Sequence, residues 1–453
     1  MAAYRGKGIG AMNAVVFLPG IMGSELRLGN ESVWPGPFSS LLLPYQKMSQ
    51  LMRSDLVATD IIRSFSFSEQ YKGILDDLKT CGFEDLSDPR TLYVVPFDWR
   101  KSNVLSAIVL ADTLDKAVME HNGDVTLSVI AHSMGGLVAR YYLESGEFSK
   151  REGIKRVRHL ITLGTPHRGA PLALTAAMGM ERRLFLSKDQ VLQLASDPRY
   201  PSLYELLPPP DEPFAWDDSG QSAFAPLNIY DSAISEGLGL ISANLDSAAN
   251  FQGKLSIARR PEGVRYFFFA GTRQVTSSCI YITKTDPRFR ARSLDLPDAG
   301  DGTVPIWSSH VTGIQSRLVG GEHGTIYKNR ELRTTLSVLL GKRGVLAAEE
   351  RIELSVRDKV VEPGAPVNIV ISFPDIVQSI DGSLRFERVD SETGNERPIG
   401  SDQVIAYAGP PLDSISLLAS TPNYSGLYRV RFSRRDKAGY AASDDMFVQE
   451  IGS

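Results

Sequence analysis

Short apolar runs alternate with amphipathic stretches over the first three-quarters of the chain. Residues 15–18, 125–131, 159–163 and 266–270 are predominantly apolar, which is typical of parallel strands that are buried on both faces of a sheet. Residues 104–118 instead place apolar side chains three or four positions apart, as on one face of a helix. This alternation of strands and helices predicts an α/β fold with a doubly wound, mostly parallel sheet.

The alternation weakens between residues 171 and 262. A proline-rich stretch, LLPPPDEPFAWDDSG, begins at Leu206 and is typical of an irregular loop. Because predicted strands precede and follow this region, we expect an insertion over one edge of the sheet. Long connections often carry or cover functional sites, so residues 171–262 are expected to form a cap or lid.

A different pattern begins after residue 351. Short alternating runs such as VNIVISF and LYRVRF are separated by EPG, DG, TG and SG, which is the spacing of an antiparallel sandwich. Tyr428 stands at the start of a late strand, as in a tyrosine corner. We expect residues 1–345 to form the α/β domain and residues 346–453 a separate immunoglobulin-like β-sandwich that supports it or binds a protein or surface partner.

Composition and charge narrow the classes of function. The 453 residues carry a formal net charge of -4 without a run of Lys and Arg, which argues against a nucleic-acid partner. Only two cysteines are present, Cys81 and Cys279, and this favours a reducing compartment. The apolar N-terminal stretch is short and interrupted by Asn13 and Pro19. We therefore expect no signal peptide or transmembrane segment, and a cytoplasmic protein.

A predicted strand, a tight turn and a predicted helix surround Ser133. The stretch SVIAHSMGGLVARYYLE begins at Ser128, and the small residues Ala131 and Gly135 stand two positions before and after Ser133. This pattern predicts a nucleophile elbow, although the usual motif has glycine where Ala131 stands. The alternative is a serine that caps the following helix. We expect His132 to shape the turn.

A serine nucleophile needs a base and an acid, and in α/β-hydrolases the acid and then the histidine follow it along the chain. Asp301 in GDGTVP and His323 in GGEHGTIY have this order and stand at predicted strand ends. Asp298 is an alternative acid and His310 an alternative base, whereas His167 precedes the acid and breaks the order. DAGDGT lacks the ligand spacing of an EF-hand, so we expect no metal, and no organic cofactor.

An acyl-transfer site also needs backbone N–H groups that bind an oxyanion. One donor is expected from the residue after the nucleophile, Met134. The other is expected from the loop after an early strand, where Pro19 and Gly20 turn the chain and leave the N–H of Ile21 free. An ordinary strand-to-helix turn explains this loop equally well.

Six motifs together resemble those of the lecithin:cholesterol acyltransferase family, which includes lysosomal phospholipases and phospholipid:diacylglycerol acyltransferases. They are, in order, FLPGIMGSEL, PFDWR, AHSMGGLVARYYLE, TLGTPHRGAP, GDGTVP and HGTIY, within residues 12–340. The resemblance implies an α/β-hydrolase that attacks an acyl ester. The residues it assigns are Ser133, Asp301 and His323 as the catalytic triad, with Ile21 and Met134 as the oxyanion hole.

The resemblance also indicates where a substrate would lie. The family's early tryptophan-containing segment is similar to ESVWPGPF, and its DWR matches residues 98–100. We expect these segments and the leucines that follow the first one to form a substrate-binding wall or lid. Its assigned residues are Trp34, Phe38, Leu42 and Trp99. The alternatives are core packing of the leucines and a structural contact between Asp98 and Arg100. The disulfide that pins the lid in secreted members has no counterpart, because residues 21–79 contain no cysteine.

Three functions follow as hypotheses. The first is a serine hydrolase of the lipase or phospholipase type, which cleaves fatty acyl esters of lipids through an acyl-enzyme. The second is an O-acyltransferase, which passes the acyl group to an alcohol instead of water. The third is a non-catalytic binding protein on a hydrolase scaffold, which the complete Ser, Asp and His set disfavours. We expect a lipid or other acyl ester as substrate and a peripheral contact with the membrane.

Overall fold

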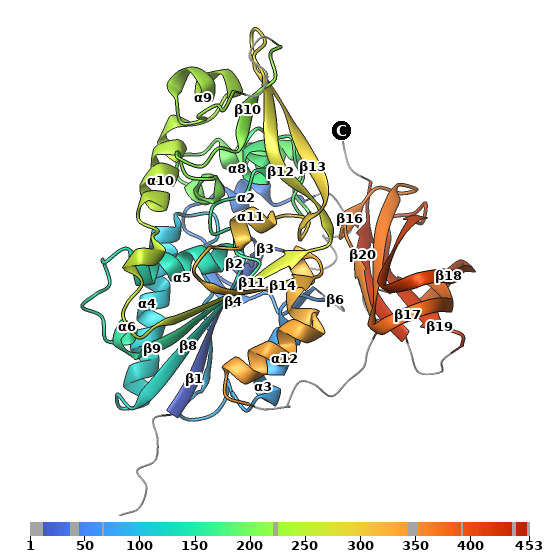
Figure 1. Cartoon of the computed structure of the whole chain (residues 1–453), viewed down its shortest axis with the longest axis horizontal. Coiled ribbons are helices and arrows are strands. Elements are labelled where there is room, and N and C mark those ends of the chain that lie inside the picture. Colours follow the sequence, from blue (N-terminus) through green and yellow to red (C-terminus); the bar gives the residue numbers. More distant parts are fainter. Residues whose placement is uncertain are drawn as a thin grey trace, which may run out of the picture.

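The computed structural model describes residues 12–36, 45–65, 68–220, 225–342, 352–390, 393–436 and 441–450. Figure 1 shows an α/β part that is built around a parallel sheet and, beside it, a sheet of C-terminal strands. No helix within these ranges combines the length and the apolar character that a membrane crossing needs.

A six-stranded sheet forms the centre of the α/β part, with the strand order β14-β11-β9-β8-β1-β7. Every neighbouring pair is parallel. The strands are β1 (Met12–Leu18), β7 (Leu92–Val94), β8 (Val125–His132), β9 (Val157–Leu163), β11 (Arg265–Thr272) and β14 (Gln315–Gly320). All four strands predicted from apolar runs belong to this sheet, and the predicted α/β fold class is confirmed.

Helices cover both faces of the parallel sheet. Side chains along β1 point alternately to opposite faces, so Val15 and Phe17 lie in a different core from Val16. The first core includes α3 (Lys72–Thr80) and α12 (Arg330–Leu339). The second includes α4 (Asn103–Glu120) and α5 (Met134–Glu144), with α6 (Glu152–Arg156) close by. The sheet is therefore doubly wound, as predicted.

Short strands and a short helix lie between β1 and α3 along the chain. After β1 come a three-stranded sheet, a short helix and a two-stranded sheet: β2 (Ser24–Leu28), β3 (Glu31–Trp34), α2 (Met48–Leu51), β4 (Val57–Ile61), β5 (Ser64–Phe65) and β6 (Ser68–Glu69).

The region predicted to be a cap lies between β9 and β11. It contains α7 (Leu172–Ala177), α8 (Lys188–Ala195), η1 (Pro201–Leu206), β10 (Ala215–Asp217), α9 (Ser232–Leu238), α10 (Ser242–Gly253) and η2 (Ile257–Arg259). Strand β10 pairs with β12 (Gln274–Thr283), which pairs with β13 (Arg290–Gly300). Together with α8–α10 these strands lie beyond the carboxyl ends of the parallel strands (Figure 1), a place that suits a cap.

The C-terminal strands form one curled network. Its order is β15-β17-β19-β20-β16, and β18 pairs with β17. The strands are β15 (Glu353–Val356), β16 (Val360–Val361), β17 (Pro366–Val389), β18 (Glu396–Ser420), β19 (Gly426–Arg434) and β20 (Ala441–Val448). The all-β character is as predicted. The Tyr428 hydroxyl donates to the Tyr424 carbonyl at 2.8 Å, as a tyrosine corner requires. The immunoglobulin-like arrangement and the domain boundary stay predictions.

The C-terminal sheet packs against the α/β part through alternate side chains of its strands. On β20, Met446 and Val448 lie in the core of the C-terminal sheet, whereas Phe447 lies in the core of the α/β part. The ring of Phe447 meets that of Phe185 edge to face, with 5.3 Å between centroids. Leu427 on β19 also lies in that core. The interface is therefore apolar and well packed at this end.

We predict that Phe447→Ala lowers the free energy of unfolding by about 3 kcal/mol, because it leaves a cavity beside Phe185. Urea denaturation followed by tryptophan fluorescence measures this. The matched control is Leu418→Ala, since Leu418 is 78% exposed and its loss leaves no cavity. Equal free energies of unfolding for the two variants would contradict the packing of Phe447 in this interface.

Candidate active site

Ser133 lies at the tip of a strained turn between β8 and α5. Its backbone angles are φ 53 and ψ -128, a region that residues with a side chain rarely occupy. Its side chain makes no capping hydrogen bond to α5, so the alternative of an ordinary helix cap is wrong. A Cβ at Gly135 would lie 2.4 Å from the carbonyl oxygen of Pro19, which explains why a glycine stands there.

The fold brings together the three residues predicted to form the triad. Asp301 follows β13, and His323 begins η3 (His323–Lys328) after β14. His323 Nε2 lies 2.8 Å from Ser133 Oγ, and His323 Nδ1 lies 2.8 Å from Asp301 Oδ2. Because a carboxylate only accepts hydrogen bonds, Nδ1 carries the proton and Nε2 is free to accept one from the serine hydroxyl.

The Asp301 carboxylate is fixed by its surroundings. It is 1% exposed, and its Oδ1 accepts hydrogen bonds from the N–H groups of Thr303 at 3.0 Å and Val304 at 2.7 Å. The remaining oxygen is thereby aimed at His323. This arrangement orients the imidazole toward Ser133, as the acid of a triad does.

The alternative residues have other partners. The exposed His310 shares a hydrogen bond of 2.9 Å with Ser316. His167 is buried against Phe268, with 3.7 Å between the ring centroids. Asp298 is exposed at the end of β13 with φ 57. The described contacts link none of these three side chains to Ser133.

The loop after β1 lies against the Ser133 side chain. A Cβ at Gly20 would come within 2.8 Å of Ser133 Cβ and 3.3 Å of Ser133 Oγ. In the described part of the chain, no hydrogen bond to another backbone group engages the N–H of Ile21. Met134 is the first residue of α5, where N–H groups have no helical acceptor. Both predicted donors are therefore available, and their role as an oxyanion hole stays a proposal.

A buried hydrogen-bond chain that the sequence did not reveal joins this loop to His323. The Gly20 N–H donates to the Tyr71 hydroxyl at 2.9 Å, which lies 2.9 Å from His132 Nδ1. His132 Nε2 lies 2.8 Å from the His323 carbonyl oxygen. Because that carbonyl can only accept, Nε2 carries the proton and Tyr71 donates to Nδ1. His132, which is expected to shape the turn, thus connects the loop after β1 with the backbone of His323.

We predict that acid destabilises the protein through His132. Burial, with a contribution from the His323 charge, lowers the pKa of His132 from 6.5 to about 3. Between these values the unfolded chain binds a proton that the folded protein does not, so stability falls as the pH falls. From pH 7 to pH 5 this amounts to about 2 kcal/mol.

Urea denaturation at both pH values measures this loss in the parent and in His132→Gln. A glutamine amide can donate to the His323 carbonyl and accept from Tyr71 without titrating. The variant should lose about 2 kcal/mol less than the parent over the same pH interval. Identical losses in the two proteins would exclude His132 as the titrating group.

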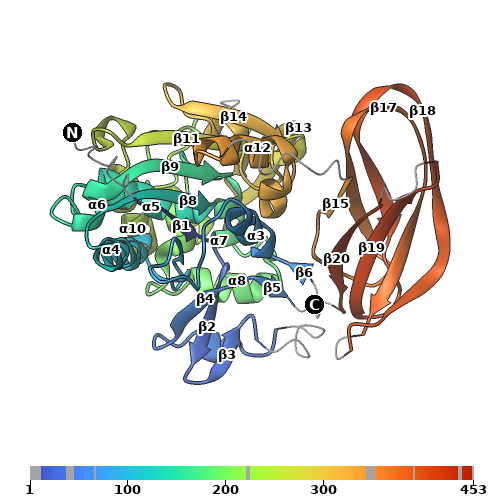
Figure 2. The same ribbon diagram turned by 90° about the horizontal axis from the view of Figure 1, so that it is seen from below.

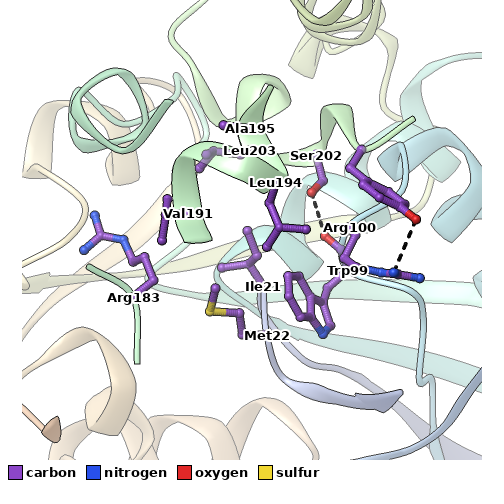
Figure 3. Close-up of a pocket in the computed structure, with 11 residues that line it drawn as sticks. Ile21, Met22, Trp99, Arg100, Arg183, Val191, Leu194, Ala195, Ser202 and Leu203 are labelled. Atoms are coloured by element: carbon purple, nitrogen blue, oxygen red, sulfur yellow. Dashed lines mark hydrogen bonds between the residues drawn. The ribbon is translucent and has the colours of Figure 1, made fainter. Parts of the chain in front are cut away.

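An apolar hollow begins at the loop after β1, where Ile21 and Met22 line it (Figure 3). It encloses about 480 Å³ of empty space, part of which is open to solvent. Residues from the loop, from the DWR motif and from the predicted cap line it: Ile21, Met22, Trp99, Arg100, Arg183, Val191, Leu194, Ala195, Tyr200, Ser202 and Leu203. The lining is mostly apolar and includes Ile21, from the loop that lies against Ser133.

The predicted substrate-binding residues have different positions. Trp99 lines the hollow, and Trp34 packs behind it with 5.2 Å between ring centroids. Trp34 has no exposed surface, and its indole N–H donates to the Met22 carbonyl at 3.0 Å. Phe38 and Leu42 lie outside the described residues. In this structure Trp34 supports the wall, and the substrate-binding roles of all four stay predictions.

The predicted alternative for the DWR motif, a structural ion pair, is present. Arg100 Nε and Nη2 donate to the two Asp98 carboxylate oxygens at 2.8 Å and 2.6 Å. Within the described ranges, no group of three or more His, Cys, Asp or Glu side chains is arranged to hold a metal. Cys81 and Cys279 are unpaired.

The chain is similar to a known protein family, to a plant protein and to a solved structure. The family model described as lecithin:cholesterol acyltransferase matches residues 53–229. The chain is 26% identical over 412 residues to lecithin-cholesterol acyltransferase-like 4 of Arabidopsis thaliana, covering 71% of this chain and 74% of that protein. A chain of the Tle4–Tli4 complex superposes with a TM-score of 0.51 at 16% identity, covering 74% of this chain and 99% of that chain. The superposition agrees with the observed fold, and the first two matches confirm the predicted resemblance to the lecithin:cholesterol acyltransferase family and the prediction of an acyl-modifying enzyme, a hydrolase or an acyltransferase.

Proposed function

We propose that this protein is a serine hydrolase that cleaves fatty acyl esters of lipids. The observation that carries the proposal is the pair of 2.8 Å contacts that link Ser133 Oγ, His323 and Asp301 beside an apolar hollow. The third hypothesis, a non-catalytic binding protein, does not explain why a strained serine, a base and a buried acid are aligned in this way.

The geometry supports a two-step reaction. His323 Nε2 accepts the proton of Ser133 as the serine oxygen attacks the ester carbonyl, and Asp301 stabilises the imidazolium that forms. The N–H groups of Ile21 and Met134 bind the oxyanion, and each such donor is typically worth about 10²–10³ in rate. His323 returns the proton to the leaving alcohol. Water then releases the acyl group from Ser133 by the same steps in reverse order.

The lining of the hollow supports a long acyl chain as the group transferred. Met22, Trp99, Val191 and Leu194 present apolar surface, and burial of each methylene of a chain gains about 0.8 kcal/mol. This gain in binding free energy per methylene favours lipid esters over short esters. A peripheral contact with a lipid surface is also part of the proposal, and Phe38 and Leu42 of the predicted lid lie outside the described residues.

An acyltransferase is the second candidate. The family matched is named for acyl transfer to an alcohol. The triad is common to both reactions, and the outcome depends on whether water or an alcohol reaches the acyl-enzyme.

Lipid mass spectrometry tests both candidates. Liposomes of mixed phospholipids and neutral lipids are incubated with the parent and with Ser133→Ala, with and without a long-chain alcohol. Free fatty acid that appears only with the parent supports hydrolysis, and a new ester that appears only with the alcohol supports transfer. Turnover of short soluble esters without any change in the lipids would replace the proposal by a general esterase.

A further inference from the structure

The loop that presents His323 is held from three directions. The backbone N–H of His323 donates to the Asp301 carbonyl at 2.9 Å, and the His323 carbonyl accepts a hydrogen bond from His132. The third hold is on the preceding residue, Glu322, whose side chain is 7% exposed. Glu322 Oε2 accepts a hydrogen bond of 2.5 Å from the hydroxyl of Ser355. Ser355 belongs to β15 of the C-terminal sheet, which faces the α/β part (Figure 2).

Ser355 is itself on a rigid element. It pairs with Val370 in the ladder between β15 and β17. The N–H of the next residue, Val356, donates at 2.9 Å to Asp444 on β20, and Lys359 forms an ion pair with the same carboxylate. The hydroxyl therefore meets Glu322 from a fixed position.

Packing alone does not hold the Glu322 side of this loop. A hollow with about 390 Å³ of empty space, partly open to solvent, borders Glu322 and Ser355. Gly321 precedes Glu322 with φ +142, and no heavy atom lies within 4 Å of a Cβ built there. The open space lies on the Glu322 side of the loop, where the Gly321 N–H donates to the Thr272 carbonyl at 3.3 Å and the Ser355 hydroxyl holds the Glu322 side chain. Burial raises the pKa of Glu322, and the hydrogen bond from Ser355 acts in the opposite direction because it stabilises the carboxylate.

We propose that Ser355 is a positioning residue for the catalytic histidine, and that turnover depends on the docked C-terminal sheet. The proposal rests on the proposed function of His323 as the base. Without the Ser355 hydroxyl, the loop moves into the adjoining hollow and the imidazole loses its alignment with Ser133. A displacement of about 1 Å at a reacting group lowers the rate by up to 10²-fold.

The test measures hydrolysis of a short p-nitrophenyl ester by the full chain. Ser355→Ala should lower kcat about 10-fold with KM unchanged, because the ester binds as before but meets a misaligned base. Labelling of Ser133 by a fluorophosphonate should slow by the same factor. Ser355→Thr, which keeps the hydroxyl, should retain most of the parent kcat. The matched control is Ser372→Ala, a serine that lines the same hollow on the neighbouring strand β17 and should behave as the parent.

A double variant keeps the proposal testable if Ser355→Ala does not fold. If Ser355→Ala leaves a buried carboxylate that unfolds the protein, the double variant Ser355→Ala/Glu322→Met removes both the contact and the charge. Replacement of both partners by apolar side chains of similar shape is nearly neutral for stability. The double variant should melt like the parent and still show the lower kcat. Parent-like kcat in a folded variant without the hydroxyl overturns the proposal, whereas a parent that neither hydrolyses esters nor is labelled overturns the proposed function itself.

Discussion

Ser133→Ala is expected to abolish the turnover of acyl esters, with a fall in kcat of about 10⁴-fold or more. The reason is that the serine oxygen supplies the covalent bond, and no other hydroxyl contacts His323 Nε2 among the described residues. The fold should not change, because alanine can occupy the same turn and, in the described part of the chain, the lost hydroxyl is hydrogen-bonded to the imidazole alone. Hydrolysis of a p-nitrophenyl ester and labelling by a fluorophosphonate measure the effect.

Ser145→Ala is the matched control, since Ser145 lies at the opposite end of α5 from Ser133. The parent and this control should both be labelled, with the label mapped to Ser133 by mass spectrometry. Label on another residue of the active parent, or unchanged turnover in a folded Ser133→Ala protein, would remove Ser133 from the mechanism.

His323→Ala is expected to lower kcat nearly as far as Ser133→Ala, because the hydroxyl is a weak nucleophile without a base. The double variant should be little worse than either single one, since the members of a triad act as a unit. Single and double variants are compared in the same ester assay at pH 7. Their thermal melts show whether each remains folded.

His310→Ala distinguishes the two candidate bases. The exposed His310 is bonded to Ser316, so its loss should leave turnover within about twofold of the parent. An inactive His310→Ala together with an active His323→Ala would reverse the assignment of the base.

The sequence alone determined the central fold and the three residues that now lie together. Buried strands are marked by their apolar runs, and the elbow at Ser133 is marked by small neighbours, because both depend on contacts within a few positions of the chain. Asp301 and His323 are then indicated by the order of acid and histidine after the serine in α/β-hydrolases. The strands and the elbow are local features, so the sequence carries them in full.

The choice between neighbouring candidates depended on tertiary structure. Asp298 and Asp301 are three positions apart and differ little as sequence, but only Asp301 follows the last residue of β13 and contacts His323. The sequence motif predicts Trp34 near the substrate but does not reveal that the fold buries it completely behind Trp99. Which side chain faces a hollow is set by the packing of whole elements.

The hydrogen bonds that hold the loops around the site could be found only from the tertiary structure. Tyr71 bridges Gly20 and His132, and Ser355 reaches Glu322 from the C-terminal sheet. No local pattern marks either residue, because a tyrosine on a helix cap or a serine on a strand is ordinary until its partner is known. Their partners lie 51, 61 and 33 positions away, and Ser133 and His323 are 190 apart. The distance between such residues is fixed by how sheets and helices pack together, whereas periodicity and turn sterics act over a few neighbouring residues.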